Sequence, residues 1–353
     1  MSTARPSADA QHRSPQGEGT AALLLEVQDL DLEYQTHRGT VQALQGVQLR
    51  VRPGEVIGLV GESGCGKTSL ARAITGVIPR NARITRGELR WQGVDLLKLT
   101  EAQHRERRWR EFAFIPQSAM NALNPVHRVG NQLAEVLTQR GNLSTAAAQT
   151  RVEALFDQVG IDPKRVRDYP HQFSGGMRQR ISIAMALALQ PRLVIADEPV
   201  TALDVIVQRQ ILDLILSLQK SLQLSMVMVT HDVSVVAYVC ESVVVMYAGQ
   251  VVETGPATQV LETPLHPYTT GLTRAFPDLQ QGIELLRPIE GSPPDLLTPP
   301  TGCRFAERCP FVQDACRAAP PPLRSVEGGT RSVACWRSDE AAVLRSLWQA
   351  EPA

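Results

Sequence analysis

The feature that most constrains this chain is the stretch GESGCGKTSLARAITG, residues 61–76, which follows the apolar run EVIGLV. Its G-x-x-x-x-G-K-T pattern, between a predicted strand and a predicted helix, is typical of a loop that cradles phosphate groups. The glycines allow backbone angles that point successive N–H groups at phosphate oxygens, and the following helix N-terminus also attracts anions. We therefore expect the chain to bind the phosphates of a nucleotide.

Each residue type in this loop has a predicted task. Lys67 can reach the β and γ phosphates as a point charge, and the Thr68 hydroxyl can ligate Mg²⁺. The variable positions contribute backbone rather than side chain, so the thiol of Cys65 has no task of its own. The predicted nucleotide-contacting residues of the loop are Gly61, Ser63, Gly64, Cys65, Gly66, Lys67, Thr68 and Ser69.

A second apolar run, LVIADEP at residues 193–199, ends in two carboxylates. Strands of a parallel sheet deliver residues to the ligand crevice at their C-terminal ends. Asp197 is then placed to hold Mg²⁺ through its water shell, and Glu198 to polarise the water that attacks the γ-phosphate. Adjacent carboxylates at a strand end are often a plain surface feature. Here they lie downstream of a phosphate loop, which favours the catalytic interpretation.

Charge and hydropathy narrow the classes of partner. Lys plus Arg and Asp plus Glu both total 36, so the chain as a whole has no excess positive charge that would favour binding to nucleic acid or to an anionic membrane surface. The basic run HRERRWR, residues 104–110, is interpreted as a solvated helix face. The longest apolar stretch, residues 181–189, is far shorter than the roughly 20 residues that span a bilayer. Residues 1–20 lack the apolar region of a secretory signal, so we expect a cytosolic chain with a disordered polar tail.

Further motifs resemble those of one family, the ATP-binding subunits of ABC transporters. The segment FSGGMRQR, residues 173–180, is similar to the family's signature motif, and VTALDV places Asp204 at the D-loop position. The strand SMVMVTHD contains His231 where the family has its switch histidine, and FAFIPQ ends in Gln117 at the Q-loop position. Together with the phosphate loop and the carboxylate strand, these motifs occur in the family's order and cover about residues 24–255.

The resemblance implies an active site shared by two chains or halves. In the family, two nucleotide-binding domains pair head to tail, so Ser174, Gly175 and Gly176 would contact the γ-phosphate held by the other domain. These residues open the expected helix 177–190, whose N-terminus offers a further anion-binding site.

The resemblance also implies roles for side chains around the reacting phosphate. Gln117 and His231 would act beside Glu198 in catalysis. Gln117 would in addition join Thr68 and Asp197 around Mg²⁺. The implied cofactors are ATP and Mg²⁺.

Four residues carry more local expectations. Tyr34 is the aromatic residue upstream of the phosphate loop; similar transporters stack adenine on such a residue, and a strand tyrosine packed in the N-terminal sheet is the alternative. Phe173 and Met177 stand where the commonest signature has Leu and Gln, and both changes are familiar in the peptide-importer branch. Cys240, inside an apolar run, is expected to be a buried small hydrophobe.

The resemblance implies an α/β fold of the ABC nucleotide-binding type. It would comprise a RecA-like phosphate-loop core, an antiparallel β subdomain and an α-helical subdomain, with a small Cys-rich C-terminal extension. We expect a tail at residues 1–22, an ATP-binding domain at 23–275 with its helical subdomain at about 118–175, and a Pro-rich linker with a Cys-rich regulatory or cluster-binding extension at 276–353.

Two regions resemble the oligopeptide and dipeptide importers in particular: QSAMNALNPVHRVG at residues 117–130 and the part that begins at LETPLHPYTTGL. The implied function is an ATPase subunit that energises a multi-subunit peptide importer from the cytoplasmic face of a bacterial inner membrane. The implied partners are two permease subunits, a second ATPase chain and indirectly an extracytoplasmic binding protein, without nucleic acid. The second ATPase chain is either a copy of this chain or a distinct homologue, and the resemblance favours the distinct homologue. Met120 and Leu123 are expected to form an exposed patch that docks on the permease.

Other functions fit the same motifs less well. An importer of another small solute, such as a metal chelate, differs only in its permease and binding protein. An exporter ATPase is disfavoured by the C-terminal region. A non-transport ABC ATPase acting on ribosomes or DNA is disfavoured by the lone nucleotide-binding domain and the balanced charge.

Four of the six cysteines, Cys303, Cys309, Cys316 and Cys335, lie near the C-terminus. A cytosolic chain has little use for disulfides, so we predict metal ligands. Their spacing, C-x5-C-x6-C-x18-C, lacks the C-x-x-C pair that structural zinc sites commonly use. Wider spacing, and Pro310 directly after Cys309, favour a [4Fe–4S] cluster of structural or regulatory role. A zinc ion and reduced structural thiols are the alternatives.

Overall fold

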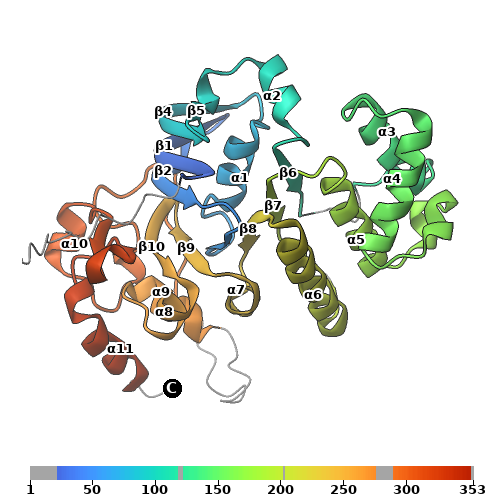
Figure 1. Cartoon of the computed structure of the whole chain (residues 1–353). Helices are drawn as coiled ribbons and strands as arrows, with labels where there is room; N and C mark the ends of the chain where they lie inside the picture. Colours follow the sequence, from blue (N-terminus) through green and yellow to red (C-terminus); the bar gives the residue numbers. More distant parts are fainter. Residues whose placement is uncertain (1–21, 118–121, 202, 276–288, 351–353) are drawn as a thin grey trace, which may run out of the picture.

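Two β-sheets frame the computed structural model, which describes residues 22–117, 122–201, 203–275 and 289–350 (Figure 1). A four-stranded antiparallel sheet has the order β2-β1-β4-β5, and an eight-stranded sheet has the order β11-β12-β10-β9-β3-β8-β7-β6. The strands are β1 Leu25–Thr36, β2 Gly39–Val51, β3 Val56–Val60, β4 Ala82–Trp91, β5 Val94–Asp95, β6 Phe112–Ile115, β7 Leu193–Asp197, β8 Ser225–Thr230, β9 Ser242–Tyr247, β10 Gln250–Pro256, β11 Arg324–Val326 and β12 Arg331–Val333.

Five neighbouring strands of the larger sheet, β9, β3, β8, β7 and β6, run parallel. Strands β3, β7 and β8 are buried along their whole length, as expected for a parallel sheet covered on both faces. Their apolar runs therefore form the centre of the fold. Because parallel strands end at one edge, the loops that follow β3, β6, β7 and β8 meet there.

Helices cover both faces of this sheet. One face packs with the N-terminal antiparallel sheet and α1 into a single apolar core, and the other packs against α5 and α6. Helices α3 and α4 extend the core on the α5 and α6 side outward from α5 and lie on the right of Figure 1. The helices are α1 Lys67–Thr75, α2 Glu101–Arg107, α3 Val129–Gln139, α4 Thr145–Gln158, α5 Gly175–Ala186, α6 Val205–Leu222, α7 Val233–Val239, α8 Ala257–Glu262, α9 Pro267–Arg274, α10 Asp314–Ala318 and α11 Ala341–Ala350.

The predicted helical segment after residue 118 is confirmed in its described part. The apolar residues spaced three and four apart in α3 and α4 face one core. Ser144 caps α4 by accepting a hydrogen bond from the backbone N–H of Ala147, as is usual for a serine at this position. Within the described residues, no helix is both long enough and apolar enough to cross a bilayer.

The C-terminal residues join the larger sheet. Strand β12 pairs antiparallel with β10, so that Glu253 lies opposite Val333. An ion pair of 2.6 Å between Arg331 and Glu253 supports this junction, and their side chains are 1% and 0% exposed. The carboxylate of Glu253 also accepts hydrogen bonds from the backbone N–H groups of Leu265 and His266, which satisfies its remaining acceptor sites. The C-terminal segment is thus built onto the same sheet that carries the phosphate loop.

Candidate active site: a phosphate loop facing paired carboxylates

The phosphate loop connects the end of β3 to the start of α1, and its glycines are required by its shape. Gly61, Gly64 and Gly66 have positive φ angles of 150°, 81° and 104°. A Cβ atom on Gly61 would lie 2.1 Å from the carbonyl oxygen of Met246, and one on Gly66 would lie 2.6 Å from that of Ala43. A side chain at either position would therefore collide with backbone. The predicted use of glycine for an unusual backbone path is confirmed.

Lys67 lies at the first turn of α1 and is only 7% exposed. Its Nζ donates to the carbonyl oxygens of Gly61 at 2.6 Å and Glu62 at 3.0 Å. Among the described residues no carboxylate forms an ion pair with this ammonium group. Nζ of Lys67 also donates to the sulfur of Cys65 at 3.6 Å. A buried cation held by two carbonyls and a thiol is poised to bind an anion, which is the task predicted for it.

The two predicted carboxylates come from the end of β7, and the structure brings Asp197 to the loop. Asp197 is 3% exposed, and the hydroxyl of Thr68, the other predicted Mg²⁺ ligand, lies near enough to act on its pKa. Burial raises the pKa of Asp197 and outweighs the opposing effect of Thr68. The two predicted protein contacts of Mg²⁺ therefore lie side by side.

Glu198 receives hydrogen bonds from two loops that follow other strands. Nε2 of Gln117, after β6, lies 2.8 Å from Oε2, and Nδ1 of His231, after β8, lies 3.0 Å from Oε1. Thr201 also donates to Oε2 at 3.1 Å. Burial by itself would raise the pKa of Glu198. The hydrogen bond with His231, together with smaller contributions from other neighbours, outweighs burial and lowers the pKa below its usual value. The carboxylate is therefore held in its ionised form.

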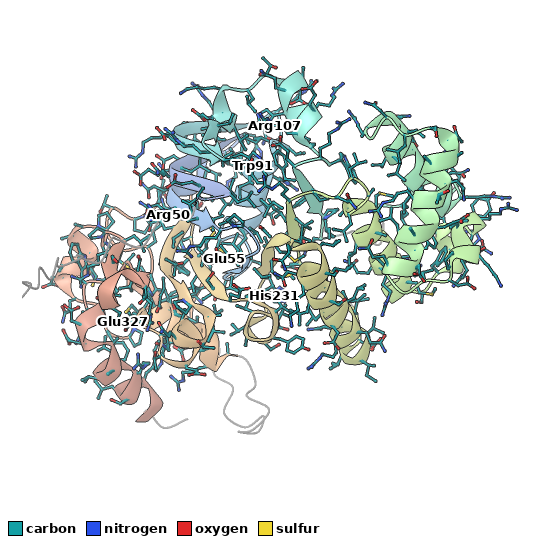
Figure 2. All side chains as sticks on the ribbon, viewed as in Figure 1. Arg50, Glu55, Trp91, Arg107, His231 and Glu327 are labelled. Atoms are coloured by element: carbon teal, nitrogen blue, oxygen red, sulfur yellow. The ribbon has the colours of Figure 1, made fainter. Side chains whose placement is uncertain are left out.

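The backbone at Glu198 is strained, with a φ of 49° in a region that residues with side chains rarely adopt. Its N–H donates to the carbonyl oxygen of Val229 at 2.8 Å, which holds the turn to the neighbouring strand β8. Strain of this kind persists only where the surroundings impose it, and it gathers at functional sites. The three residues predicted for catalysis, Gln117, Glu198 and His231, thus form one cluster (His231 is labelled in Figure 2).

The signature segment opens α5, as predicted. The Ser174 hydroxyl caps the helix by accepting from the N–H of Met177 at 3.3 Å. The two unusual residues share a partner: the guanidinium of Arg165 lies 4.3 Å from the centre of the Phe173 ring, and its Nη1 lies 3.4 Å from the sulfur of Met177. Within the described chain, no hydrogen bond joins Ser174 to the phosphate loop. The contact predicted across two chains remains a prediction.

Comparison with known proteins decides the family. Residues 44–201 match the profile of the family described as ABC transporter, and residues 252–316 match that described as Oligopeptide/dipeptide transporter, C-terminal region. The chain is 45% identical to the Probable peptide ABC transporter ATP-binding protein y4tR of Sinorhizobium fredii, over 92% of this chain and 98% of the relative. This chain belongs to the ABC transporter ATP-binding proteins of the oligopeptide and dipeptide class.

Other relatives agree with this assignment. The chain is 44% identical to the Dipeptide transport ATP-binding protein DppD of Bacillus subtilis, over 90% of this chain and 96% of the relative. It is 43% identical to the Oligopeptide transport ATP-binding protein OppD of Escherichia coli, over 92% of this chain and 96% of the relative. The dimeric ADP- and Pi-bound structure of the ATP-binding cassette MJ0796 matches with a TM-score of 0.59 and 25% identity, over 66% of this chain and 98% of that one. As an ABC ATP-binding protein, the chain is an ATPase with the cassette fold.

Two further predicted residues of this ABC protein contact the first turn of a helix. The Tyr34 hydroxyl lies 3.0 Å from Oγ of Ser69 in the first turn of α1, and its ring packs partly against the N-terminal core. This contact places Tyr34 beside the loop, and adenine stacking stays a prediction. Asp204 caps α6 by accepting from the N–H of Val207 at 2.9 Å.

Two surface predictions need correction. Leu123 is 4% exposed and belongs to the apolar core that includes α3 and α4, so its predicted place in an exposed docking patch is wrong; Met120 lies outside the described residues.

The prediction that residues 104–110 form a solvated helix face fits α2, which has no buried residue. It does not fit the arginine that follows this helix. Arg108 pairs with Glu101 at 2.9 Å and donates to the carbonyl oxygen of Gly76 at 2.6 Å.

The four C-terminal cysteines of this ABC protein line one small cavity, together with apolar residues that include Phe305 and Trp336. All six cysteines are free thiols. Within the described part of the chain, no three His, Cys, Asp or Glu side chains are grouped so that they could hold a metal ion. The described residues therefore form no ready-made metal site for either an iron–sulfur cluster or a zinc ion. Cys240 packs against two apolar cores, as predicted, although its side chain is partly rather than fully buried.

The sequence did not reveal two residues that fix the phosphate loop. The hydroxyl of Tyr268 in α9 accepts a hydrogen bond of 2.9 Å from the N–H of Glu62, and Arg308 forms a two-pronged ion pair with the Glu62 carboxylate. Both partners are distant in sequence, and no short motif links them to the loop.

Proposed function

We propose that this chain hydrolyses ATP to energise the import of peptides through separate permease subunits, at the cytoplasmic face of the membrane. The observation that carries the enzymatic part is the convergence of Gln117 and His231 on Glu198, beside the loop that holds Lys67. The match of residues 252–316 to the oligopeptide/dipeptide C-terminal region supports the substrate class.

The residues present fit ATP and Mg²⁺. Lys67 and the loop N–H groups would bind the β and γ phosphates, while Thr68 and Asp197 would hold Mg²⁺, with Gln117 nearby. When bound, Mg²⁺ supplies positive charge that offsets the charge developing on the phosphate oxygens.

The reaction then needs a base and a fixed water. Glu198 would accept a proton from a water molecule as the water oxygen bonds to the γ-phosphorus. The bond from that phosphorus to the bridging oxygen breaks, which releases ADP and phosphate. Gln117 and His231 would fix the orientation of the Glu198 carboxylate, and a lowered pKa keeps it ready to accept the proton.

A second ATPase chain would complete the site. Directly after Asp204, the side chains of Val205 and Ile206 are 83% and 73% exposed, which is unusual for neighbouring aliphatic residues and fits a surface that another chain covers. The MJ0796 cassette was solved as a dimer. We infer that Ser174, Gly175 and Gly176 contact the nucleotide of that partner, and that the partner is a homologous but distinct chain.

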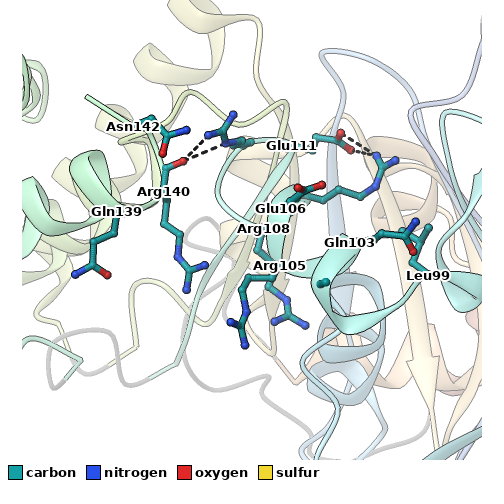
Figure 3. A pocket seen from close by; sticks show the side chains of 12 residues that line it. Leu99, Gln103, Arg105, Glu106, Arg108, Glu111, Gln139, Arg140 and Asn142 are labelled. Carbon is teal, nitrogen blue, oxygen red and sulfur yellow. Dashed lines mark hydrogen bonds and ion pairs between the residues drawn. The ribbon is translucent and has the colours of Figure 1, made fainter. Parts of the chain in front are cut away.

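A groove between α2 and the end of α3 supports a docking site for the permease (Figure 3). Its charged lining is Arg105, Arg107, Arg108, Arg110, Arg140, Glu106 and Glu111. Arg107 pairs with Glu111 at 2.6 Å, whereas Arg110, among the residues that the structure describes, bonds only to the backbone carbonyl of Arg140. Arginines outnumber carboxylates here by five to two, so the groove fits an acidic cytoplasmic segment of the permease.

The charge of this groove can be tested by reversal. The double substitution Arg105→Glu and Arg140→Glu should reduce co-purification with the permease and leave ATP binding by the isolated subunit unchanged. Arg38→Glu, in the exposed turn between β1 and β2, is the matched control. Assembly at the wild-type level would remove the groove from the proposal.

The cysteine cavity is the proposed site of a [4Fe–4S] cluster, held by Cys303, Cys309, Cys316 and Cys335. The fit rests on two observations. The four thiols surround one almost wholly apolar cavity, and the sulfur atom of Cys335 receives a hydrogen bond of 3.4 Å from the backbone N–H of Arg337. Hydrogen bonds to sulfur and apolar surroundings are features of cluster sites. A bound cluster would supply cross-links between turns that have little core of their own.

The transport function is tested by reconstituting the chain with its permease and second ATPase in proteoliposomes. ATP-dependent uptake of a labelled di- or oligopeptide library, captured by the cognate binding protein, is the expected result. Uptake of a metal chelate without peptide uptake would instead establish the alternative solute.

A further inference from the structure

The phosphate loop carries a carboxylate of its own. Glu62 lies between Gly61 and Ser63, and its side chain is 28% exposed. Its backbone carbonyl accepts a hydrogen bond of 3.0 Å from Nζ of Lys67. The ammonium group therefore contacts the backbone of the residue that carries this carboxylate, and the side-chain torsions of Glu62 set the distance between the two charges. A negative charge at this place would compete with phosphate for Lys67 and repel the nucleotide.

Arg308, in the C-terminal segment, binds both oxygens of the Glu62 carboxylate. Its Nη1 donates to one oxygen of Glu62 at 2.6 Å and its Nη2 to the other at 2.9 Å, which is the two-pronged geometry that makes such pairs specific. The hydrogen bonds with Glu62 raise the pKa of Arg308 above its usual value.

The guanidinium group is itself fixed. The Arg308 side chain is 4% exposed. Its Nε donates to the carbonyl oxygen of Glu290 at 2.8 Å, and its Nη2 to that of Ile289 at 3.1 Å. Tyr247, at the end of β9, accepts from Nη1 at 3.3 Å. Because every nitrogen of the group has a partner, Arg308 is a rigid anchor rather than a mobile surface charge.

We propose that Arg308 is a positioning residue for nucleotide binding, which keeps the Glu62 carboxylate away from Lys67 and from the phosphates. This inference rests on the proposed role of Lys67 as the phosphate anchor. Through its positioning role Arg308, which is 246 residues from Glu62 in the chain, lets the C-terminal segment influence ATP affinity. The pair neutralises a charge inside the loop and fixes where that charge points.

The test is a rescue experiment on the full chain, with equilibrium binding of ATP and steady-state kinetics as readouts. Arg308→Gln should weaken ATP binding and raise KM about tenfold with little change in kcat, as expected for the loss of one nearby charge interaction. Adding Glu62→Gln to that variant should restore affinity to within about threefold of wild type, because the competing carboxylate is gone. Arg308→Lys should fall between the two, since lysine cannot bond both oxygens in a fixed plane.

Two controls separate the possible causes. Arg331→Gln breaks the other buried pair between the C-terminal segment and the sheet, so it should lower thermal stability without the ATP-specific loss. Lys67→Ala tests the site itself. If Lys67→Ala weakens binding and Arg308→Gln does not, or if Glu62→Gln gives no rescue, the positioning role is wrong while the proposed site stands. If Lys67→Ala leaves ATP binding intact, the proposed site is wrong as well.

Discussion

Nδ1 of His231 lies 3.0 Å from Oε1 of Glu198, so the loop after β8 orients the carboxylate at the end of β7. With Nδ1 protonated, the imidazole donates to the carboxylate and limits its rotation. His231→Ala should therefore reduce kcat by about 10²-fold, typical for the loss of help to a catalytic base, while ATP affinity stays within about twofold. Single-turnover hydrolysis in the assembled complex measures this. A fall in affinity with unchanged turnover would contradict the role.

Lys67 should govern affinity rather than turnover alone. Lys67→Ala removes the only charge predicted to reach the phosphates from inside the loop, so the Kd for Mg·ATP should rise by about 10²-fold. Equilibrium dialysis with labelled ATP is the measurement. Lys220→Ala, at an exposed position on α6, is the matched control and should bind ATP normally.

The apparent affinity for Mg²⁺ should fall as the pH falls. Burial raises the pKa of Asp197, so protons compete with Mg²⁺ at a higher pH than they would at an ordinary aspartate. The pKa of Glu198 is lowered, so the base stays ionised over the same window, and turnover at saturating Mg²⁺ should be less sensitive. ATPase activity titrated with Mg²⁺ between about pH 7 and pH 5 tests this. Asp197→Asn should bind Mg²⁺ more weakly and lose this part of the pH dependence.

The buried pair of Arg331 and Glu253 should matter for stability. Arg331→Met leaves a buried carboxylate without its cation and should cost about 3–5 kcal/mol of unfolding free energy. Arg50→Ala, which breaks a pair of 3.4 Å with an arginine side chain 70% exposed, should cost less than about 1 kcal/mol. Urea denaturation of both variants gives the comparison. Equal losses would show that the junction of β12 with β10 does not support the core.

The cysteine site has a direct optical test. Protein purified without oxygen should be brown, absorb broadly near about 400 nm and carry roughly four irons per chain. Cys309→Ser should lose iron and colour, whereas Cys240→Ser should keep both. A colourless wild-type protein with one zinc per chain would rule out the cluster.

Sequence reasoning found what is local in the chain. The loop around Lys67, the strand that ends at Asp197 and the helices after residue 128 each have a short pattern whose physics is self-contained, and the structure confirms them. The convergence on Glu198 could be expected only because parallel strands end at one edge of the sheet.

Other relationships depend on packing between distant segments. Nothing in the residues around Glu62 predicts a partner 246 positions later, and nothing in Arg331 predicts a strand beside β10. Leu123 was predicted to be exposed because its segment resembles one that docks on a permease, yet its side chain is buried in the apolar core. A loop residue that is buried alone has no periodic pattern to reveal it.

The central claim is that Glu198 is the base for hydrolysis, and Glu198→Gln tests it most directly. Glutamine keeps the shape and can still bond Gln117 and His231, but it cannot accept a proton. The measurement is ATP turnover by the assembled transporter, together with retention of bound ATP. We predict a loss of turnover of at least about 10²-fold with ATP still bound and the paired ATPase chains trapped together. Hydrolysis close to the wild-type rate would contradict the account.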